Sequence, residues 1–318
     1  MFLESQIEYL LWLQNIRVIT NGIFDQFFMS ITRFGEFLIP AAFITFIYWS
    51  LNKKVGEFLI LTHAFSLLFN QFIKMMAGIN RPWVLNDNIK PVPEAIPRAS
   101  GYSFPSGHTA NAMALWGGLA VLFWENKKIR YSMFIFILLI AFSRNYLGVH
   151  TPQDVIVSIL LGIIILYFAN KFFKKTENNN NSDIKIFAIG AILTIVTIFA
   201  VILKYFNLEG QKFLDYVYQM PSFYFNIGYV FGAISGWLAC RKLIPFETDN
   251  ISWIKRIFRF IFGYSVMLLI LFQGIEVLIS DFGKCRGNFI CAFVIGVFIT
   301  FFYPWIFTRI EKYFKLKG

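Results

Sequence analysis

The stretch VIVSILLGIIILYF, residues 155–168, decides the class of fold. It lies within an apolar run from 153 to 173, and a helix needs about 20 mostly apolar residues to cross a bilayer. In hydrocarbon the backbone must satisfy its own hydrogen bonds, which favours helices. The sequence therefore predicts an all-α, polytopic helical membrane protein. Eight further runs are candidate spans: 35–51, 55–78, 107–125, 130–148, 184–205, 222–242, 257–280 and 288–308.

The composition excludes a protein that has water as its main solvent. Of the 318 residues 57% are hydrophobic and 15% are charged, and the mean hydropathy is +0.60. Soluble domains have about 45–50% apolar and about 25% charged residues, and they cannot bury a much larger apolar share. The scattered Cys240, Cys285 and Cys291 form neither a disulfide framework nor a known metal-ligand spacing.

The chain divides into four predicted regions. Residues 1–34 mix apolar and charged side chains, which indicates an amphipathic helix at the membrane interface that can also complete the core bundle. Residues 35–175 form a catalytic core, and 176–183 form a polar linker rich in Asn. Residues 184–318 form an accessory region with four transmembrane helices, which includes Gln273 and Glu276 within an apolar run.

Basic residues predict the orientation of the chain, because they concentrate in the cytoplasmic loops of membrane proteins. One set of loops and the C-terminus carry 18 of the 29 Lys and Arg residues. We therefore expect a multi-pass protein of the cytoplasmic membrane with a cytoplasmic C-terminus. The net charge of +11 reflects these anchoring loops rather than a nucleic-acid partner. The proline-containing loop 86–103 then faces outside.

Polar islands interrupt the apolar pattern at three places, and this topology puts all of them on the outer side. They are Lys74-x6-Arg81-Pro82, Pro105-Ser106-Gly107-His108 and Ser143-Arg144-x5-His150-x3-Asp154.

The islands predict an anion site, because three of their side chains are cations. Lys74 and Arg81 are two helical turns apart, and Arg144 comes from another span. Guanidinium groups match phosphate oxygens, and the free N–H groups of the helix that Ser106 and Gly107 begin favour the same ligand.

Two histidines supply reactive groups. His150 and Asp154 are four residues apart, so on one helix the carboxylate can fix the tautomer of the imidazole and leave the other nitrogen as a nucleophile or base. His108 can protonate a leaving oxygen. We expect a phosphoryl-transfer site without a metal or other cofactor.

The three motifs together resemble the type-2 phosphatidic-acid phosphatase and vanadium haloperoxidase superfamily, over residues 35–173. The resemblance implies an acid-phosphatase-like helical bundle with extra C-terminal transmembrane helices. It also implies that His150 becomes a phosphohistidine, that Asp154 orients it and that His108 protonates the leaving group. The residues that match the family's phosphate ligands are Lys74, Arg81, Ser106, Gly107 and Arg144.

The leading hypothesis is a metal-independent lipid phosphatase of the bilayer. Its substrates would be a polyprenyl diphosphate such as undecaprenyl diphosphate, phosphatidate or phosphatidylglycerophosphate. Transfer of the phosphoryl or head group to an acceptor other than water is an alternative. A lipid transporter or scramblase is another, although the halves show no internal repeat. A haloperoxidase would be soluble. The sequence does not identify the lipid, the oligomeric state or the role of residues 184–318.

Overall fold

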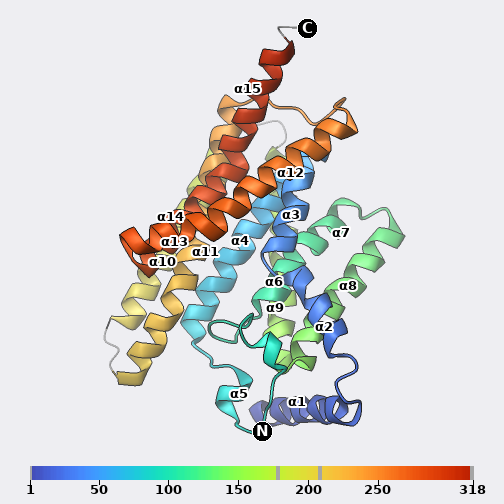
Figure 1. The fold of residues 1–318 in the computed structure, drawn as a ribbon, viewed down its shortest axis with the longest axis vertical. Coiled ribbons are helices and arrows are strands. Elements are labelled where there is room, and N and C mark those ends of the chain that lie inside the picture. The colour runs from blue at the N-terminus through green and yellow to red at the C-terminus, as the bar shows by residue number, and fades with distance from the viewer. Residues whose placement is uncertain (1, 177–179, 207–209, 316–318) are drawn as a thin grey trace. The chain divides into compact units, whose positions relative to one another are not determined.

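The protein is all-α in the residues that the structure describes. This computed structural model describes residues 2–176, 180–206 and 210–315, and every regular element in them is a helix (Figure 1). The helices divide into two compact units, residues 1–40 with 69–168 and residues 41–68 with 169–318. Of the linker predicted at 176–183, residues 177–179 lie outside the described residues, and the rest is helical, because one helix ends at Thr176 and the next begins at Asn180.

Six helices of the described residues are long and apolar enough to cross a membrane, so the prediction of a polytopic membrane protein is confirmed. A bent pair, Asp25–Gly35 with Leu38–Leu51, makes a seventh if it counts as one span. Two of the nine predicted spans fail the same test. The run Gly107–Leu122 is too short, and α8 (Lys127–Tyr146) carries basic residues at both ends.

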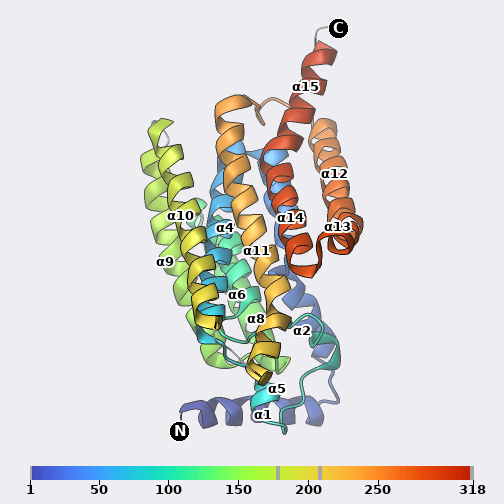
Figure 2. The ribbon, with the colours of Figure 1, turned by 90° about the vertical axis from the view of Figure 1, so that its left-hand side faces the viewer.

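The first unit begins with two helices, where the sequence predicts one amphipathic helix over 1–34. Asn21 and Gly22, both at positive φ, reverse the chain between them. In both views α1 (Phe2–Ile19) lies across the lower ends of α8 and α9 (Pro152–Thr176) (Figure 2). The unit contains α1 (Phe2–Ile19), α2 (Asp25–Thr32), η1 (Arg33–Gly35), α5 (Pro82–Leu85), η3 (Pro93–Ala95), α6 (Gly107–Ala112), η4 (Met113–Gly117), α7 (Gly118–Leu122), α8 and parts of α3, α4 and α9.

The long loop after α5 is packed into the first unit. Val92, Ala95 and Ala99 are buried in a cluster with Tyr146 and Leu147, at the end of α8. The N–H of Val92 donates to the carbonyl of Leu147 over 3.1 Å. The loop therefore lies in a fixed position beside the start of α9.

Helix α1 holds the other end of this loop. Its buried strip of Ile7, Leu10 and Leu13 packs on Ile89. The Gln14 side chain donates to the carbonyl of Asn88 and accepts from the N–H of Lys90. The apolar side of α1 and its Gln14 side chain thus fix the position of this part of the loop.

The second unit is built around a close contact between α11 and α14. Glycines recur every fourth residue along α11. A Cβ at any of these three positions would collide with an atom of the neighbouring helical segment. The pairs are Gly228 with Phe289, Gly232 with Phe293 and Gly236 with Thr300. Small residues at this spacing let two membrane helices approach closely. The unit contains η2 (Ile47–Leu51), α10 (Asn180–Tyr205), α11 (Gly210–Leu243), α12 (Trp253–Leu269), η5 (Ile270–Gly274), α13 (Ile275–Phe282), α14 (Lys284–Val297), η6 (Phe298–Phe302), α15 (Tyr303–Lys315) and parts of α3 (Leu38–Phe46), α4 (Lys53–Ala77) and α9 (Pro152–Thr176).

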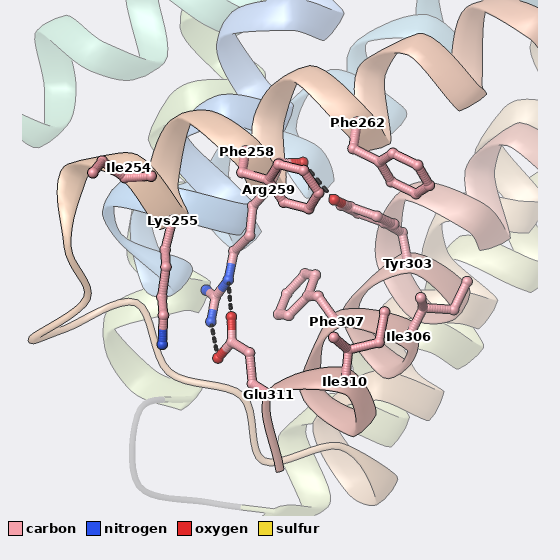
Figure 3. A pocket seen from close by; sticks show the side chains of 10 residues that line it. All are labelled: Ile254, Lys255, Phe258, Arg259, Phe262, Tyr303, Ile306, Phe307, Ile310 and Glu311. Atoms are coloured by element: carbon pink, nitrogen blue, oxygen red, sulfur yellow. Dashed lines mark hydrogen bonds and ion pairs between the residues drawn. The ribbon is translucent and has the colours of Figure 1, made fainter. Parts of the chain in front are cut away.

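A mostly apolar cavity of about 500 Å³ lies between α12 and α15 in this unit. Figure 3 shows Phe258, Phe262 and Phe307 on its walls and a bonded pair, Arg259 with Glu311, at one end. The hydroxyl of Tyr303 donates to the carbonyl of Arg259 over 2.6 Å. These polar contacts join the two helices.

Candidate active site

The first unit brings the three polar islands of the sequence together around His150. This residue precedes α9 and is 1% exposed. Its Nδ1 lies 3.1 Å from Oδ2 of Asp154, one helical turn later. The same carboxylate oxygen accepts from the N–H of Thr151 over 2.9 Å and from the hydroxyl of Ser103. Asp154 is therefore fixed by three donors and holds the imidazole with Nδ1 as the donor.

The other nitrogen of the imidazole faces a cation. Nη1 of Arg81 lies 2.8 Å from Nε2 of His150 and 3.0 Å from the carbonyl of Val149. The remaining Arg81 donors bind the carbonyls of Ser100 and Gly101, each over 2.8 Å. Arg81 thus joins the loop to His150, and the Nε2 lone pair is directed toward a positive charge.

Burial lowers the pKa of His150 well below its ordinary value. The charges of Arg81, Arg144, Lys74 and His108 lower the same pKa further, so all four side chains lie close enough to act on His150. An imidazole with a lowered pKa is neutral over a wider pH range, and the neutral form is the nucleophile.

Arg144 is a buried cation with unused donors. Its side chain is fully buried near the end of α8, and Nη1 donates to the hydroxyl of Thr32 over 2.7 Å. Nε and Nη2 have no hydrogen-bond partner in the described part of the chain. Buried donors without partners are costly, so this guanidinium is arranged for an acceptor that binds from outside the chain.

Lys74 binds the backbone in this structure. Its ammonium donates to the carbonyls of Tyr102, Ser103 and Pro105, over 2.8, 3.3 and 2.8 Å. Three contacts account for all three protons of an ammonium. Lys74 therefore holds the loop that carries Ser103, and it contributes its charge to the site from behind that loop.

Ser106 and Gly107 begin α6 beside these cations. Ser106 is the N-cap, and its hydroxyl accepts from the side chain of Thr109 over 3.0 Å. A Cβ added at Gly107 would meet no atom within 4 Å. The first turn of α6 therefore presents open space at its N-terminus, where a helix favours anions.

His108 follows on the same helix, and its carboxylate neighbour was not predicted. Nε2 of His108 has no hydrogen-bond partner among the described residues, and it lies 3.9 Å from Oε1 of Glu36. Arg98 donates to both oxygens of Glu36, over 2.7 and 3.0 Å.

Two family models match separate parts of this chain. The model of the PAP2 superfamily matches residues 57–178, which include every predicted site residue. The model of the transmembrane extension of PAP2 superfamily phosphatases matches residues 224–315. Undecaprenyl-diphosphatase BcrC of Bacillus subtilis is 32% identical over 48% of this chain and 76% of its own length.

The chain belongs to the PAP2 superfamily.

The names of other relatives of this PAP2 protein refer to different lipids. Lipid A 4'-phosphatase of Porphyromonas gingivalis is 28% identical over 52% of the chain and 75% of its own length. Lipid phosphate phosphatase delta of Arabidopsis thaliana is 29% identical over 46% of the chain and 38% of its own length. No solved structure matches the chain.

Sequence reasoning missed four residues that contact the candidate site: Ser103 on Asp154, Thr32 on Arg144, and the Glu36–Arg98 pair near His108. Glu36 and Thr32 precede residue 57, where the PAP2 match begins. Their residue types are ordinary at helix ends and in loops. The one available signal was Glu36 itself, a carboxylate at the edge of an apolar run.

Proposed function

We propose that this protein is an integral membrane phosphatase that hydrolyses a lipid phosphate or diphosphate through a phosphohistidine at His150. One observation carries the proposal. A buried imidazole is held at Nδ1 by Asp154, while the charges of Lys74, Arg81 and Arg144 gather around it without a carboxylate bonded to any of them in the described residues. Such a site is prepared for a reactive anion.

In the first step Nε2 of His150 attacks phosphorus. The N–P bond forms while the bond from phosphorus to the leaving oxygen breaks, and Asp154 stabilises the imidazolium character that develops. His108 gives a proton to the leaving oxygen. Arg144 and the N–H groups at the start of α6 bind the phosphoryl oxygens as charge moves onto them.

In the second step water attacks phosphorus and displaces His150. His108, now neutral, takes a proton from the water that attacks phosphorus, and the N–P bond breaks. Inorganic phosphate leaves and His150 regains its neutral form. The site therefore needs one nucleophile and one group that alternates as acid and base.

We propose that side-chain cations supply the positive charge that a divalent metal supplies in other phosphatases. Arg81 and Arg144 are rigid donors with fixed positions, and Lys74 adds a third charge. Electrostatic stabilisation of the transferring group is the main requirement of phosphoryl transfer.

The relatives and the membrane setting support a phosphorylated lipid as the substrate. The names of the similar proteins include an undecaprenyl-diphosphatase, a lipid A phosphatase and a phosphatidylglycerophosphatase, and each names a phosphorylated lipid. A phosphate-release screen with the purified protein tests the proposal. We expect release from at least one of polyprenyl diphosphate, phosphatidate and phosphatidylglycerophosphate. Lack of release from all three would contradict it.

We propose that the site faces the outside of the cytoplasmic membrane, because most basic residues belong to the opposite loops. Asn88, in the exposed part of the loop after α5, and Lys127, at the start of α8, lie on opposite sides in this topology. In a Cys285→Ser background, Asn88→Cys should react with an impermeant maleimide in intact cells, and Lys127→Cys should not. The reverse pattern would overturn the orientation.

A further inference from the structure

Glu36 lies at the break between η1 and α3, beside the active-site helix that carries His108. Its carboxylate is 3.9 Å from Nε2 of His108, and the side chains of both residues are mostly buried. Arg98, from the loop after η3, donates to both carboxylate oxygens from the other side. The carboxylate therefore lies between a fixed guanidinium and the imidazole.

The backbone around Glu36 is held against the helix of His108. A Cβ added at Gly35 would lie 2.6 Å from the carbonyl oxygen of His108, so only glycine permits this approach. Asn111 donates to the carbonyl of Gly35 over 3.0 Å, and Trp116 donates to the carbonyl of Phe34 over 3.2 Å. Both donors belong to the helical run that contains His108. The distance from Glu36 to His108 is therefore set by several independent contacts.

The charges near His108 oppose its role as an acid. Burial lowers the pKa of this imidazole to about 3, with Arg144 and Arg81 acting in the same direction, while Glu36 raises it. Arg98 is also positive, although it is bonded to Glu36. Among the described residues Glu36 supplies the carboxylate within ion-pair distance of His108, and it favours the imidazolium.

An exposed Arg–Glu pair ordinarily contributes little to stability, because water and salt screen its charges. Three observations distinguish Glu36 from such a pair. It approaches His108, its position depends on a glycine contact and two side-chain hydrogen bonds to the backbone, and the same segment gives Arg144 its partner Thr32. The segment from Thr32 to Glu36 is therefore part of the active site.

We propose that Glu36 is a positioning residue that raises the proton affinity of His108, which favours the imidazolium that gives its proton to the leaving oxygen. This inference rests on the proposed phosphatase function. In the reaction the proton passes from His108 to the leaving oxygen as the P–O bond breaks. Glu36 remains ionised and takes no part in bond formation, so its effect is on the proton affinity of His108.

The inference predicts a loss that depends on the leaving group. An alkyl leaving group needs a proton, while p-nitrophenolate leaves without one. Glu36→Gln should lower kcat/KM for phosphatidate about 10- to 100-fold at neutral pH. It should shift the basic limb of the phosphatidate profile to lower pH. For p-nitrophenyl phosphate kcat/KM should change less than about threefold, since this parameter reports only the steps up to the phosphoenzyme.

Two further variants complete the experiment. Glu36→Asp keeps the charge and should recover part of the activity on phosphatidate. Glu94→Gln removes an exposed carboxylate from the loop that carries Arg98, and it should leave both substrates unaffected. Equal losses on the two substrates, or no loss on either, would overturn the inference while the phosphatase function stands. A wild-type protein that releases phosphate from none of polyprenyl diphosphate, phosphatidate, phosphatidylglycerophosphate and p-nitrophenyl phosphate would overturn both.

Discussion

Buried and half-buried cations in the two units of this protein differ in whether a carboxylate is bonded to them. In the second unit Arg259 binds Glu311 through two hydrogen bonds of 2.9 and 2.8 Å (Figure 3). Arg241 likewise binds Glu57 and Asp183, over 2.8 and 2.7 Å. These cations are neutralised within the chain and join its helices.

The cations near His150 in the first unit lack such partners. Lys74 and Arg81 bind backbone carbonyls, and Arg144 binds one hydroxyl. In the described residues none of the three has an ion pair with a carboxylate. Burying a charge without a counter-charge is costly, so a fold that keeps three of them has a use for an anion. A phosphate with two negative charges meets this requirement.

The largest expected effect is a loss of phosphate release that occurs when one of two buried histidines is replaced and not when the other is. His150, in the first unit, and His63, in the second, are 1% and 0% exposed. His150→Ala removes the nucleophile, so phosphate release should fall at least about 10³-fold. His63→Gln should retain most of the activity per folded molecule. Similar losses in the two variants would place the chemistry elsewhere.

The next prediction compares two arginines, with activity and stability measured on the same samples. Arg144→Met keeps the volume and removes a charge that lacks a counter-charge, so kcat/KM should fall about 10²- to 10³-fold while Tm does not fall. Arg241→Met leaves Glu57 and Asp183 as unpaired buried carboxylates, which costs about 3 kcal/mol.

Arg241→Met should therefore lower Tm markedly and leave the kinetic constants of the remaining folded protein near those of the wild type. If Arg144→Met destabilises the protein as much as Arg241→Met does, the two regions do not differ in the way described above.

A smaller effect concerns pH. Burial and the nearby cations lower the pKa of His150, so its neutral, nucleophilic form persists below the ordinary value of about 6.5. The acid limb of kcat/KM for p-nitrophenyl phosphate should therefore lie below pH 6.5, after correction for titration of the substrate. A tenfold fall per pH unit that begins near pH 7 would show that the cations do not act on His150 in this way.

The smallest effect is expected from metal removal. Because side-chain cations provide the positive charge of the site, excess EDTA should leave kcat/KM within about twofold of the untreated value. A complete loss that Mg²⁺ restores would mean that Lys74, Arg81 and Arg144 do not suffice for catalysis.

The sequence allowed prediction of the helical membrane fold and of the residues that meet around His150. Apolar length predicts spanning helices, and the spacing of His150 and Asp154 predicts their contact. The family resemblance is confirmed by the two family matches. The predictions of the helices and of the site residues depend on residue types and local spacing, which are visible in one sequence.

Other features depend on the path of the chain and were not predicted. Lys74 binds three carbonyls because of how residues 102–105 turn, and Glu36 meets His108 only because two distant segments pack together. The packing of α2 on α8 places Thr32 beside Arg144. The grouping of residues 41–68 with the C-terminal helices is also a property of packing.

A phosphoenzyme trap tests the role of His150 most directly. In His108→Ala, ³²P-labelled p-nitrophenyl phosphate should still phosphorylate the protein, but hydrolysis lacks its base, so the intermediate should accumulate. We expect label that is stable in alkali and labile in acid on the peptide that contains His150. The label should be absent when His150 is also replaced. Label on another residue, or release of nitrophenol without any labelled protein, would contradict the mechanism.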